Sequence, residues 1–401
     1  MSTTPYLMNT LPAYKRELDT NDADTLGLCA ADRVARVLAL RENSGPTPLH
    51  SLQCLANEIR VTSLHVKDEG FRLGLGSFKA LGGAYALMIL VQEEASRRLN
   101  RAVAIEELMS EEVRAIASEM TFACATDGNH GRSVAQGAQL MGSRAVIFVH
   151  AGVSEARIEA IARFGAEIVR VHGSYDCSVE EATRVATEKG WTILSDTSWP
   201  GYEYIPGLVS QGYIAMVREI LGELRYTPTH VFLQAGVGGM AAAVSGHLAV
   251  ALGSKRPHVT VVEPKRAACL FESAKVGFPI KVGEGQPTVM AMLECYEPSK
   301  VAFRILERVA DGFMTVDEED AVDVMRRLAS PAGDDPAIVS GESGGAGLAG
   351  VLSVVRDEAL AKAIGLGIES RVLVINTEGA TDPALYERIV GRSPLAVLMA
   401  K

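Results

Sequence analysis

Residues 121–150, TFACATDGNHGRSVAQGAQLMGSRAVIFVH, decide the fold. The apolar run TFACAT predicts a strand that ends in a turn, HGRSVAQGAQLMG predicts a helix, and AVIFVH predicts a second strand. A helix between two strands favours a parallel pair, because parallel strands need a long crossover connection.

The same alternation continues as far as Asp196. SEARIEAIARFGA predicts a helix with Ser154 as its N-cap, EIVRVH a strand, SVEEATRVATEKG a helix and WTILSD a strand. Strands that alternate with helices in this way predict a parallel sheet with right-handed crossovers.

A second series of strands and helices begins at Thr229. It reads THVFLQAG, MAAAVSGHLAVALG, HVTVVEP, then after a long excursion GFMTV, EEDAVDVMRRLA, GGAGLAGVLSVVRDEAL and RVLVINTEG. The sequence therefore predicts an α/β protein with two open, mostly parallel twisted sheets flanked by helices. We expect a discontinuous large domain, 1–79 and 206–401, a small domain, 80–205, and a ligand site in the cleft between them.

The composition excludes several classes of protein. The net charge is -10, and neither Lys nor Arg forms a long run, which argues against a nucleic-acid or anionic-membrane surface. Residues 231–253 lack charged side chains, but their glycines, Gln234 and His247 favour a buried strand, turn and helix over a membrane span. The N-terminus does not resemble a signal peptide, so we expect a cytoplasmic protein. The cysteines and histidines show no metal-ligand spacing, so no metal is predicted.

Two segments carry candidate chemistry. Lys79 in GSFKALGG lies just inside the start of a predicted helix, where the helix dipole lowers the pKa of an amine and favours its nucleophilic form. Such an amine forms Schiff bases. QAGVGG, residues 234–239, lies between a strand and a helix and predicts a cradle for a phosphate.

The glycine loop also allows a different interpretation. Gly236, Gly238 and Ala241 match the relaxed dinucleotide pattern GxGxxA, and Glu263 ends the next predicted strand, where a ribose-binding acid belongs. This favours an NAD-dependent oxidoreductase. It leaves Lys79 and its neighbouring glycines unexplained.

GSFKALGG, TDGNHGRSVA, QAGVGG and GESGGAG occur in this order, and together they resemble the fold-type II pyridoxal-phosphate enzymes, the family of threonine dehydratase and tryptophan synthase β. SDTSWPGYEYIPGLVSQGY and NTEGATD resemble the branch of that family that eliminates ammonia from 2,3-diaminopropionate. The resemblance implies pyridoxal 5′-phosphate as cofactor, a small amino acid as substrate, pyruvate and two ammonia molecules as products, and a homodimer.

The resemblance also implies roles for individual residues. Lys79 would hold the cofactor, Asn129 would bond its ring oxygen, and Thr377 would face its ring nitrogen and leave it unprotonated. The phosphate would lie against the glycine loop. The remaining implied assignments are phosphate binding by Gly236, Val237, Gly238 and Gly239, substrate binding by Ser77, Thr126, Asp127, Gly128 and Asp196, and catalysis by Lys79, Asp127 and Asp196.

Asp127 follows one predicted strand and Asp196 ends another, and two carboxylates in one cleft repel each other unless a cation or a shared proton compensates. The second amino group of a diamino acid is such a cation. Asp127 is alternatively a helix N-cap and Asp196 a turn residue. A serine or threonine dehydratase with the same cofactor and a small-ligand binding protein without catalysis stay open as alternatives.

Three further residues are expected to have supporting roles. We expect His130 to order its loop rather than to transfer protons. Trp199 and Tyr202 are expected either to line the substrate pocket or to pack over a domain edge.

Overall fold

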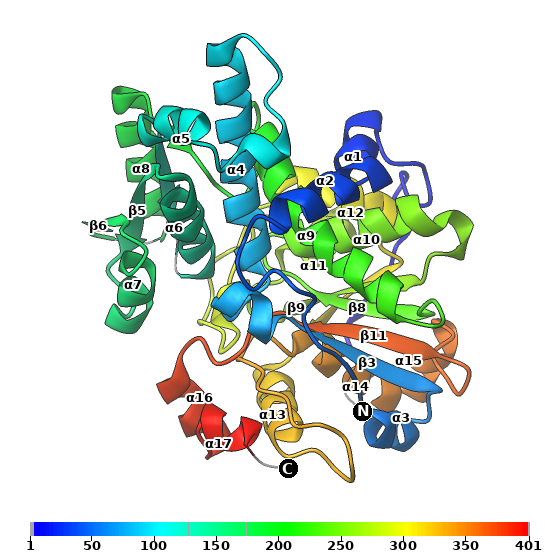
Figure 1. Cartoon of the computed structure of the whole chain (residues 1–401). Coiled ribbons are helices and arrows are strands. Elements are labelled where there is room, and N and C mark those ends of the chain that lie inside the picture. The colour runs from blue at the N-terminus through cyan, green and yellow to red at the C-terminus, as the bar shows by residue number, and fades with distance from the viewer. Residues whose placement is uncertain (1–3, 127, 174, 400–401) are drawn as a thin grey trace. The chain divides into compact units, whose positions relative to one another are not determined.

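The computed structural model describes residues 4–126, 128–173 and 175–399, and the chain divides into two compact units (Figure 1). The larger unit contains Met1–Leu28, Pro46–Phe71 and Met216–Lys401, and the smaller contains Cys29–Gly45 and Arg72–Ala215. The smaller unit thus includes segments on both sides of the predicted small domain, 80–205. The domain boundaries given by the sequence stay a prediction.

The larger unit is built on a seven-stranded sheet with the strand order β1-β10-β9-β8-β11-β3-β2. The inner strands are parallel, and the two edge strands β1 and β2 are antiparallel to their neighbours. The strands are β1 (Tyr6–Met8), β2 (Leu49–Ser51), β3 (Ser63–Asp68), β8 (His230–Gln234), β9 (His258–Pro264), β10 (Gly312–Val316) and β11 (Arg371–Asn376).

Helices of the larger unit cover this sheet, and α14 packs its buried side chains into the main hydrophobic core (Figure 1). Asp317 is the N-cap of α13, and its N–H donates a hydrogen bond to the carboxylate of Asp320 in the first turn at 3.2 Å. The α-helices are α1 (Thr20–Thr25), α3 (Gln53–Glu58), α10 (Gly239–Leu252), α11 (Cys269–Val276), α12 (Lys300–Val309), α13 (Glu318–Ala329), α14 (Ala346–Arg356), α15 (Glu358–Ala363), α16 (Pro383–Val390) and α17 (Pro394–Leu398); the short 3-10 turns are η3 (Gly253–Lys255) and η4 (Ala291–Leu293).

The smaller unit contains a four-stranded parallel sheet with the order β6-β5-β4-β7. This is the sheet that residues 121–196 predicted. Its strands are β4 (Thr121–Ala125), β5 (Arg144–His150), β6 (Glu167–Val171) and β7 (Thr192–Ile193). Its helices are α4 (Lys79–Leu99), α5 (Glu111–Ser118), α6 (Asn129–Met141), α7 (Glu155–Ala162) and α8 (Tyr175–Lys189), with the 3-10 turn η2 (Ile105–Glu107); α2 (Leu28–Leu38), α9 (Tyr204–Glu223) and the 3-10 segment η1 (Glu69–Gly74) extend across the boundary between the units.

Glycines of α4 and α6 bring α4 close to α6 and to the part of α9 that belongs to the smaller unit. A Cβ atom on Gly82 of α4 would lie 2.6 Å from Cε1 of Tyr213, which belongs to α9. A Cβ atom on Gly137 of α6 would lie 2.8 Å from Cα of Ala84. Real Cβ atoms do not approach other atoms so closely, so larger residues at these positions would push the helices apart. The glycines therefore hold the start of α4 against α6 and α9.

Several local expectations were wrong. The sequence did not predict β1, β2 and β3, although β3 lies inside the larger sheet. The helix expected over GGAGLAGVLSVVRDEAL ends at Arg356 and a new one starts after Asp357, whose carboxylate accepts a hydrogen bond from the N–H of Leu360 at 3.0 Å. Ser154 is the N-cap residue of α7, as predicted, although its side chain makes no cap hydrogen bond.

The apolar stretch 231–253 forms most of β8, a glycine turn and α10, as predicted. Within residues 4–126, 128–173 and 175–399, no helix is both long enough and apolar enough to cross a membrane.

Candidate functional site

Lys79 is the first residue of α4. The Oγ of Ser77, a buried residue, accepts a hydrogen bond from the Lys79 N–H at 3.3 Å, which satisfies one of the open donors at the helix start. The Lys79 ammonium is hydrogen-bonded to the carboxylate of Asp196 in the same unit. The structure therefore brings together two of the three predicted catalytic residues, and it assigns the Ser77 hydroxyl a bond to the backbone.

Asp196 follows β7, and its side chain is 15% exposed. Burial raises the pKa of this carboxyl, but the nearby Lys79 ammonium lowers it more, so the pKa lies well below its ordinary value of 3.8. Asp196 is therefore an anion at neutral pH. Its role is to pair with a cation, and it does not carry a proton at this pH.

His130 lies next to this ion pair. Its Nε2 lies 3.0 Å from the carbonyl oxygen of Leu194, which can only accept, so Nε2 carries the ring hydrogen. Burial lowers the pKa of His130, which keeps the imidazole neutral. His130 thus ties α6 to the end of β7, in agreement with the expected ordering role.

Tyr202 supports the segment that carries Asp196. Its hydroxyl donates to the carbonyl of Ile193 at 2.8 Å and accepts from the N–H of Ser195 at 3.0 Å. The rings of Trp199 and Tyr202 stack with their centroids 4.1 Å apart. The polar end of Tyr202 therefore binds backbone on both sides of Leu194, and its expected part in lining a substrate pocket stays a prediction.

Tyr213 is a residue that the sequence did not single out. It is buried, its ring lies edge-on to Phe78 at 4.8 Å, and its hydroxyl has no hydrogen-bond partner among the described residues. Burial raises the pKa of this phenol, and the charges of Lys79 and Asp196 act on it in opposite directions. Its ring contact with Phe78, next to Lys79 in the chain, could not be found from sequence spacing.

The turn between β4 and α6 contains four predicted site residues. The Thr126 hydroxyl accepts hydrogen bonds from the N–H groups of Gly128 and Gly131, at 3.1 and 3.2 Å. Gly128 is the N-cap of α6, and Asn129 is its first residue and is buried. Asp127 lies outside the described residues. Thr126 therefore orders the start of α6, and the substrate-binding roles of these residues stay predictions.

The predicted phosphate loop lies in the larger unit, after β8. Gly238 is the N-cap of α10 with φ 96°, a conformation that glycine adopts easily, and Gly239 is the first residue of the helix. The carbonyl of Val237 accepts a hydrogen bond from the N–H of Ser299 at 3.0 Å. A Cβ atom on Gly236 would lie 2.8 Å from Sγ of Cys295, so a larger residue here would require the Cys295 side chain to move.

The N-terminus of α10 is suited to an anion. The first turn has no acidic residue, and no side chain caps it. The N–H groups at a helix start have no partner within the helix, and the helix dipole favours negative charge there. The loop therefore fits a phosphate group.

Thr377 follows β11, the strand next to β8 in the larger sheet, so both loops lie at the carboxyl ends of neighbouring parallel strands. Thr377 is buried, and its Oγ1 accepts a hydrogen bond from Nε2 of Gln234 at 2.9 Å. Among the described residues, the Thr377 hydroxyl accepts this bond but donates no hydrogen bond of its own. A buried donor in this state fits an acceptor on a ligand, such as an unprotonated ring nitrogen.

The dinucleotide interpretation is wrong for Glu263. This buried residue accepts hydrogen bonds from the N–H groups of Leu270 and Phe271, at 2.8 and 2.6 Å. Burial raises the pKa of its carboxyl to about 8. Glu263 therefore satisfies the start of α11 and is not presented to a ribose.

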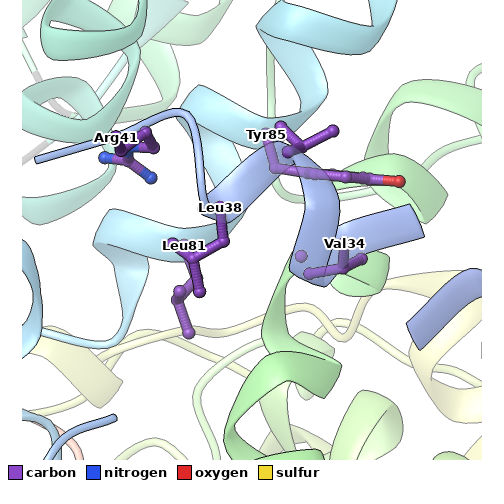
Figure 2. Close-up of a pocket in the computed structure, with 7 residues that line it drawn as sticks. Val34, Leu38, Arg41, Leu81 and Tyr85 are labelled. Atoms are coloured by element: carbon purple, nitrogen blue, oxygen red, sulfur yellow. The ribbon is translucent and has the colours of Figure 1, made fainter. Parts of the chain in front are cut away.

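A separate small cavity lies in the smaller unit, between α2 and α4, with space for about 10 Å³, roughly one water molecule (Figure 2). Leu38, Leu81, Arg41 and Tyr85 are among its lining residues. The Arg41 guanidinium donates to the carbonyl of Ala80 at 2.8 Å, so this region supports the first turn of α4. In the described part of the chain, no cluster of three or more His, Cys, Asp or Glu residues could hold a metal ion.

Two α/β sheets with a lysine at a helix start, and with an anion cradle on another helix, define the class of fold-type II pyridoxal-phosphate enzymes. The chain belongs to this family, because the family described as "Pyridoxal-phosphate dependent enzyme" matches residues 40–378. Its cofactor is pyridoxal 5′-phosphate. The predicted fold class and cofactor are confirmed.

The chain is similar to the diaminopropionate ammonia-lyase of Escherichia coli K12, with 41% identity over 360 residues, 88% of this chain and 89% of the relative. The crystal structure of the Escherichia coli enzyme in complex with an aminoacrylate-PLP azomethine intermediate matches with a TM-score of 0.85 and 36% identity over 96% of each chain. The biosynthetic L-threonine dehydratase of Escherichia coli is 25% identical over 328 residues, 79% of this chain and 54% of that enzyme.

Proposed function

We propose that this protein is a pyridoxal-phosphate dependent ammonia-lyase that converts D- and L-2,3-diaminopropionate into pyruvate and two ammonia molecules. The similarity to diaminopropionate ammonia-lyases over 88% of the chain supports this substrate. The observation that carries the proposal is the Asp196 carboxylate, mostly buried and hydrogen-bonded to an ammonium group.

An anionic, mostly buried carboxylate selects for a substrate with a positive side chain. A charge removed from water needs a partner of opposite sign, and leaving it alone costs several kcal/mol. Lys79 is that partner in the structure. The β-ammonium group of diaminopropionate has the same charge and hydrogen-bonding capacity as the lysine head group, so it can take this place. The side-chain hydroxyl of serine or threonine cannot.

Bound pyridoxal phosphate supplies an electron-accepting ring that makes the α-hydrogen of an attached amino acid acidic. In our proposal, Lys79 holds the cofactor and, as a free amine, accepts or returns a proton at Nζ. Asp196 orients the β-ammonium group, so that the leaving nitrogen departs protonated. Asn129 contacts the ring oxygen, Thr377 the ring nitrogen, and the loop after β8 the phosphate.

We further propose that Asp127 is the general base that accepts the α-proton of the D isomer. In the sequence it is the second residue after the end of β4, but it lies outside the described residues, so its assignment depends on the motif alone. Ser77, Thr126 and Gly128 are proposed to line the substrate site, which in our proposal lies near the start of α4 and α6.

A serine or threonine dehydratase is the second candidate, favoured by the more distant match to threonine dehydratase. Dehydratases release water instead of an amine, so they need no anion for a β-ammonium group. The two candidates therefore differ in the need for Asp196. We also propose that the protein is cytoplasmic and forms a homodimer. Sedimentation of the holoenzyme tests the oligomeric state.

The testing experiment measures pyruvate release by the holoenzyme from D- and L-diaminopropionate, serine and threonine. We expect diaminopropionate to be preferred, and Asp196→Asn to lower kcat/KM for both of its isomers by roughly 10²-fold. Asp127→Asn should affect mainly the D isomer. The cofactor absorbance serves as the control that each variant still binds pyridoxal phosphate. Better turnover of serine or threonine, or unchanged activity of Asp196→Asn, would favour the dehydratase.

A further inference from the structure

Gln234, the last residue of β8, lies in the centre of a buried hydrogen-bond network behind Thr377. Its Nε2 lies 2.5 Å from the carbonyl oxygen of Gly344, 2.9 Å from that of Ile375 and 2.9 Å from Oγ1 of Thr377. The network thus links the turn before α14, the end of β11 and the end of β8.

The carbonyl groups fix the orientation of the Gln234 amide. A carbonyl oxygen only accepts hydrogen bonds, so the group that faces the carbonyls of Gly344 and Ile375 must be the NH₂ group. The amide oxygen of Gln234 points the other way, where a Cβ atom on Gly347 would lie 2.9 Å from it. The absence of a side chain at Gly347 leaves room for this orientation. In it the amide oxygen is buried and has no hydrogen-bond partner among the described residues, so the two carbonyl contacts alone fix the orientation.

The amide orientation also decides where the Thr377 hydroxyl hydrogen can point. An amide nitrogen does not accept hydrogen bonds, and its two hydrogens face three oxygens, so the contact at 2.9 Å uses a hydrogen of Gln234 that is shared with a backbone carbonyl, and a lone pair of Thr377. The hydroxyl hydrogen must point away from Gln234. Because Thr377 is buried and no described residue accepts this hydrogen, an acceptor on the ligand would satisfy it.

We propose that Gln234 is a positioning residue that makes Thr377 a hydrogen-bond donor, and so selects the unprotonated form of the cofactor ring nitrogen. A protonated ring nitrogen would be a second donor facing Thr377. It would leave the hydroxyl hydrogen buried without a partner, which is unfavourable. This inference rests on the proposed function, in which the ring nitrogen faces Thr377.

The test uses the full-length enzyme loaded with pyridoxal phosphate that is ¹⁵N-labelled at the ring nitrogen. The ¹⁵N chemical shift reports protonation of this atom independently of catalysis. We expect the unchanged enzyme to hold an unprotonated ring nitrogen from pH 6 to 9. A protonated nitrogen at pH 7 would overturn the proposal without any variant.

Gln234→Glu keeps the shape of the side chain and replaces the NH₂ group with a carboxyl oxygen that can accept from Thr377. The Thr377 hydroxyl can then turn, and its oxygen becomes an acceptor for a ring N–H. We expect protonation of the ring nitrogen to begin at a pH about one unit higher, or more. Gln234→Met, which has no amide, should act in the same direction and covers the case in which the Glu variant does not fold.

Two variants of Thr377 separate the possible failures. In a Thr377→Val background, Gln234→Glu should no longer shift ring protonation, because the hydroxyl that transmits the effect is absent. Thr377→Asp should protonate the ring nitrogen if that atom faces position 377. If Thr377→Asp shifts the signal and both Gln234 variants do not, the role of Gln234 is wrong and the proposed function stands. If Thr377→Asp has no effect, the cofactor placement itself is wrong.

Discussion

The ammonium group of Lys79 is hydrogen-bonded to the carboxylate of Asp196, and the two side chains are 22% and 15% exposed. Both charges are largely removed from water, so each depends on the other for compensation. This dependence gives the pair a measurable signature, because removal of one charge changes the protonation of the other.

Lys79→Met should raise the pKa of Asp196. The ammonium group that lowers this pKa is then absent, while burial, which raises it, remains. We expect the pKa to move from below 3.8 in the unchanged protein to above 3.8 in the variant. Titration of the Asp carboxyl carbon by ¹³C NMR measures this. Lys265→Met, which disrupts an exposed ion pair with Asp317, is the control and should leave Asp196 unchanged.

The same pair makes the stability of the protein depend on pH. The folded-state pKa of Asp196 lies below its ordinary value of 3.8, so its contribution is complete above about pH 4 and is lost as the pH falls through the folded pKa. Asp196→Asn should therefore flatten the acid side of the curve of unfolding free energy against pH. A curve that keeps its slope below pH 4 would contradict the assigned shift.

Tyr202→Phe should loosen the segment that carries Asp196. The variant loses a donor to the Ile193 carbonyl and an acceptor for the Ser195 N–H. We expect the free energy of unfolding to fall by about 1 kcal/mol, and KM for diaminopropionate to rise. Denaturant titration and steady-state kinetics test this. Tyr226→Phe, at an exposed tyrosine, is the matched control. Equal effects of the two variants would argue against the role of Tyr202 in holding the segment that carries Asp196.

Much of this site could be predicted from the sequence because its chemistry depends on backbone conformation. Glycines at 236 and 238 and a lysine at the start of a helix leave a local pattern that spacing alone shows. Gln234 left no such pattern, since its partners Gly344, Ile375 and Thr377 are more than 100 residues away in the chain. The direction of the Thr377 hydroxyl hydrogen, on which the role of Gln234 depends, can be inferred only from the positions of these partners in the folded structure.

The errors in the fold have a similar cause. β3 is a parallel strand between β11 and β2, and it carries Lys67, a fully buried lysine whose ammonium lies 2.7 Å from Oε2 of Glu219. A charged residue interrupts the apolar pattern from which a buried strand is predicted, so the sequence does not indicate that β3 is buried. Hydrophobic periodicity predicted one helix that runs through Asp357. In the structure the first helix ends before Asp357, because the carboxylate of this residue caps the next helix.

Glu263→Gln should change the pH dependence of stability in the neutral range. The folded-state pKa of Glu263 is raised to about 8 from 4.5, so stability is complete below about pH 4.5 and falls as the pH rises towards 8. The variant does not titrate, so this decline should become shallower. It should also be less stable at pH 4, because its NH₂ group faces an N–H of α11. Denaturant titrations from pH 4 to 9 measure both effects, and parallel curves for the two proteins would contradict the raised pKa.

Tyr213→Phe should leave the protein as stable as before or more stable by up to about 2 kcal/mol, because it removes a buried hydroxyl that has no partner among the described residues. One explanation for a buried polar group without a partner is a role toward a ligand, and for Tyr213 the charges of Lys79 and Asp196 both act on the phenol. We therefore expect kcat/KM for diaminopropionate to fall by about tenfold while stability is retained.

Tyr386→Phe is the matched control for this prediction. Tyr386 is also buried, its hydroxyl also has no partner among the described residues, and it lies on α16 in a hydrophobic cluster of the larger unit. We expect the same effect on stability and no change in kcat/KM. A loss of stability in Tyr213→Phe would mean that its hydroxyl has a partner in the free protein. Equal activity of the two variants would mean that the Tyr213 hydroxyl takes no part in the reaction.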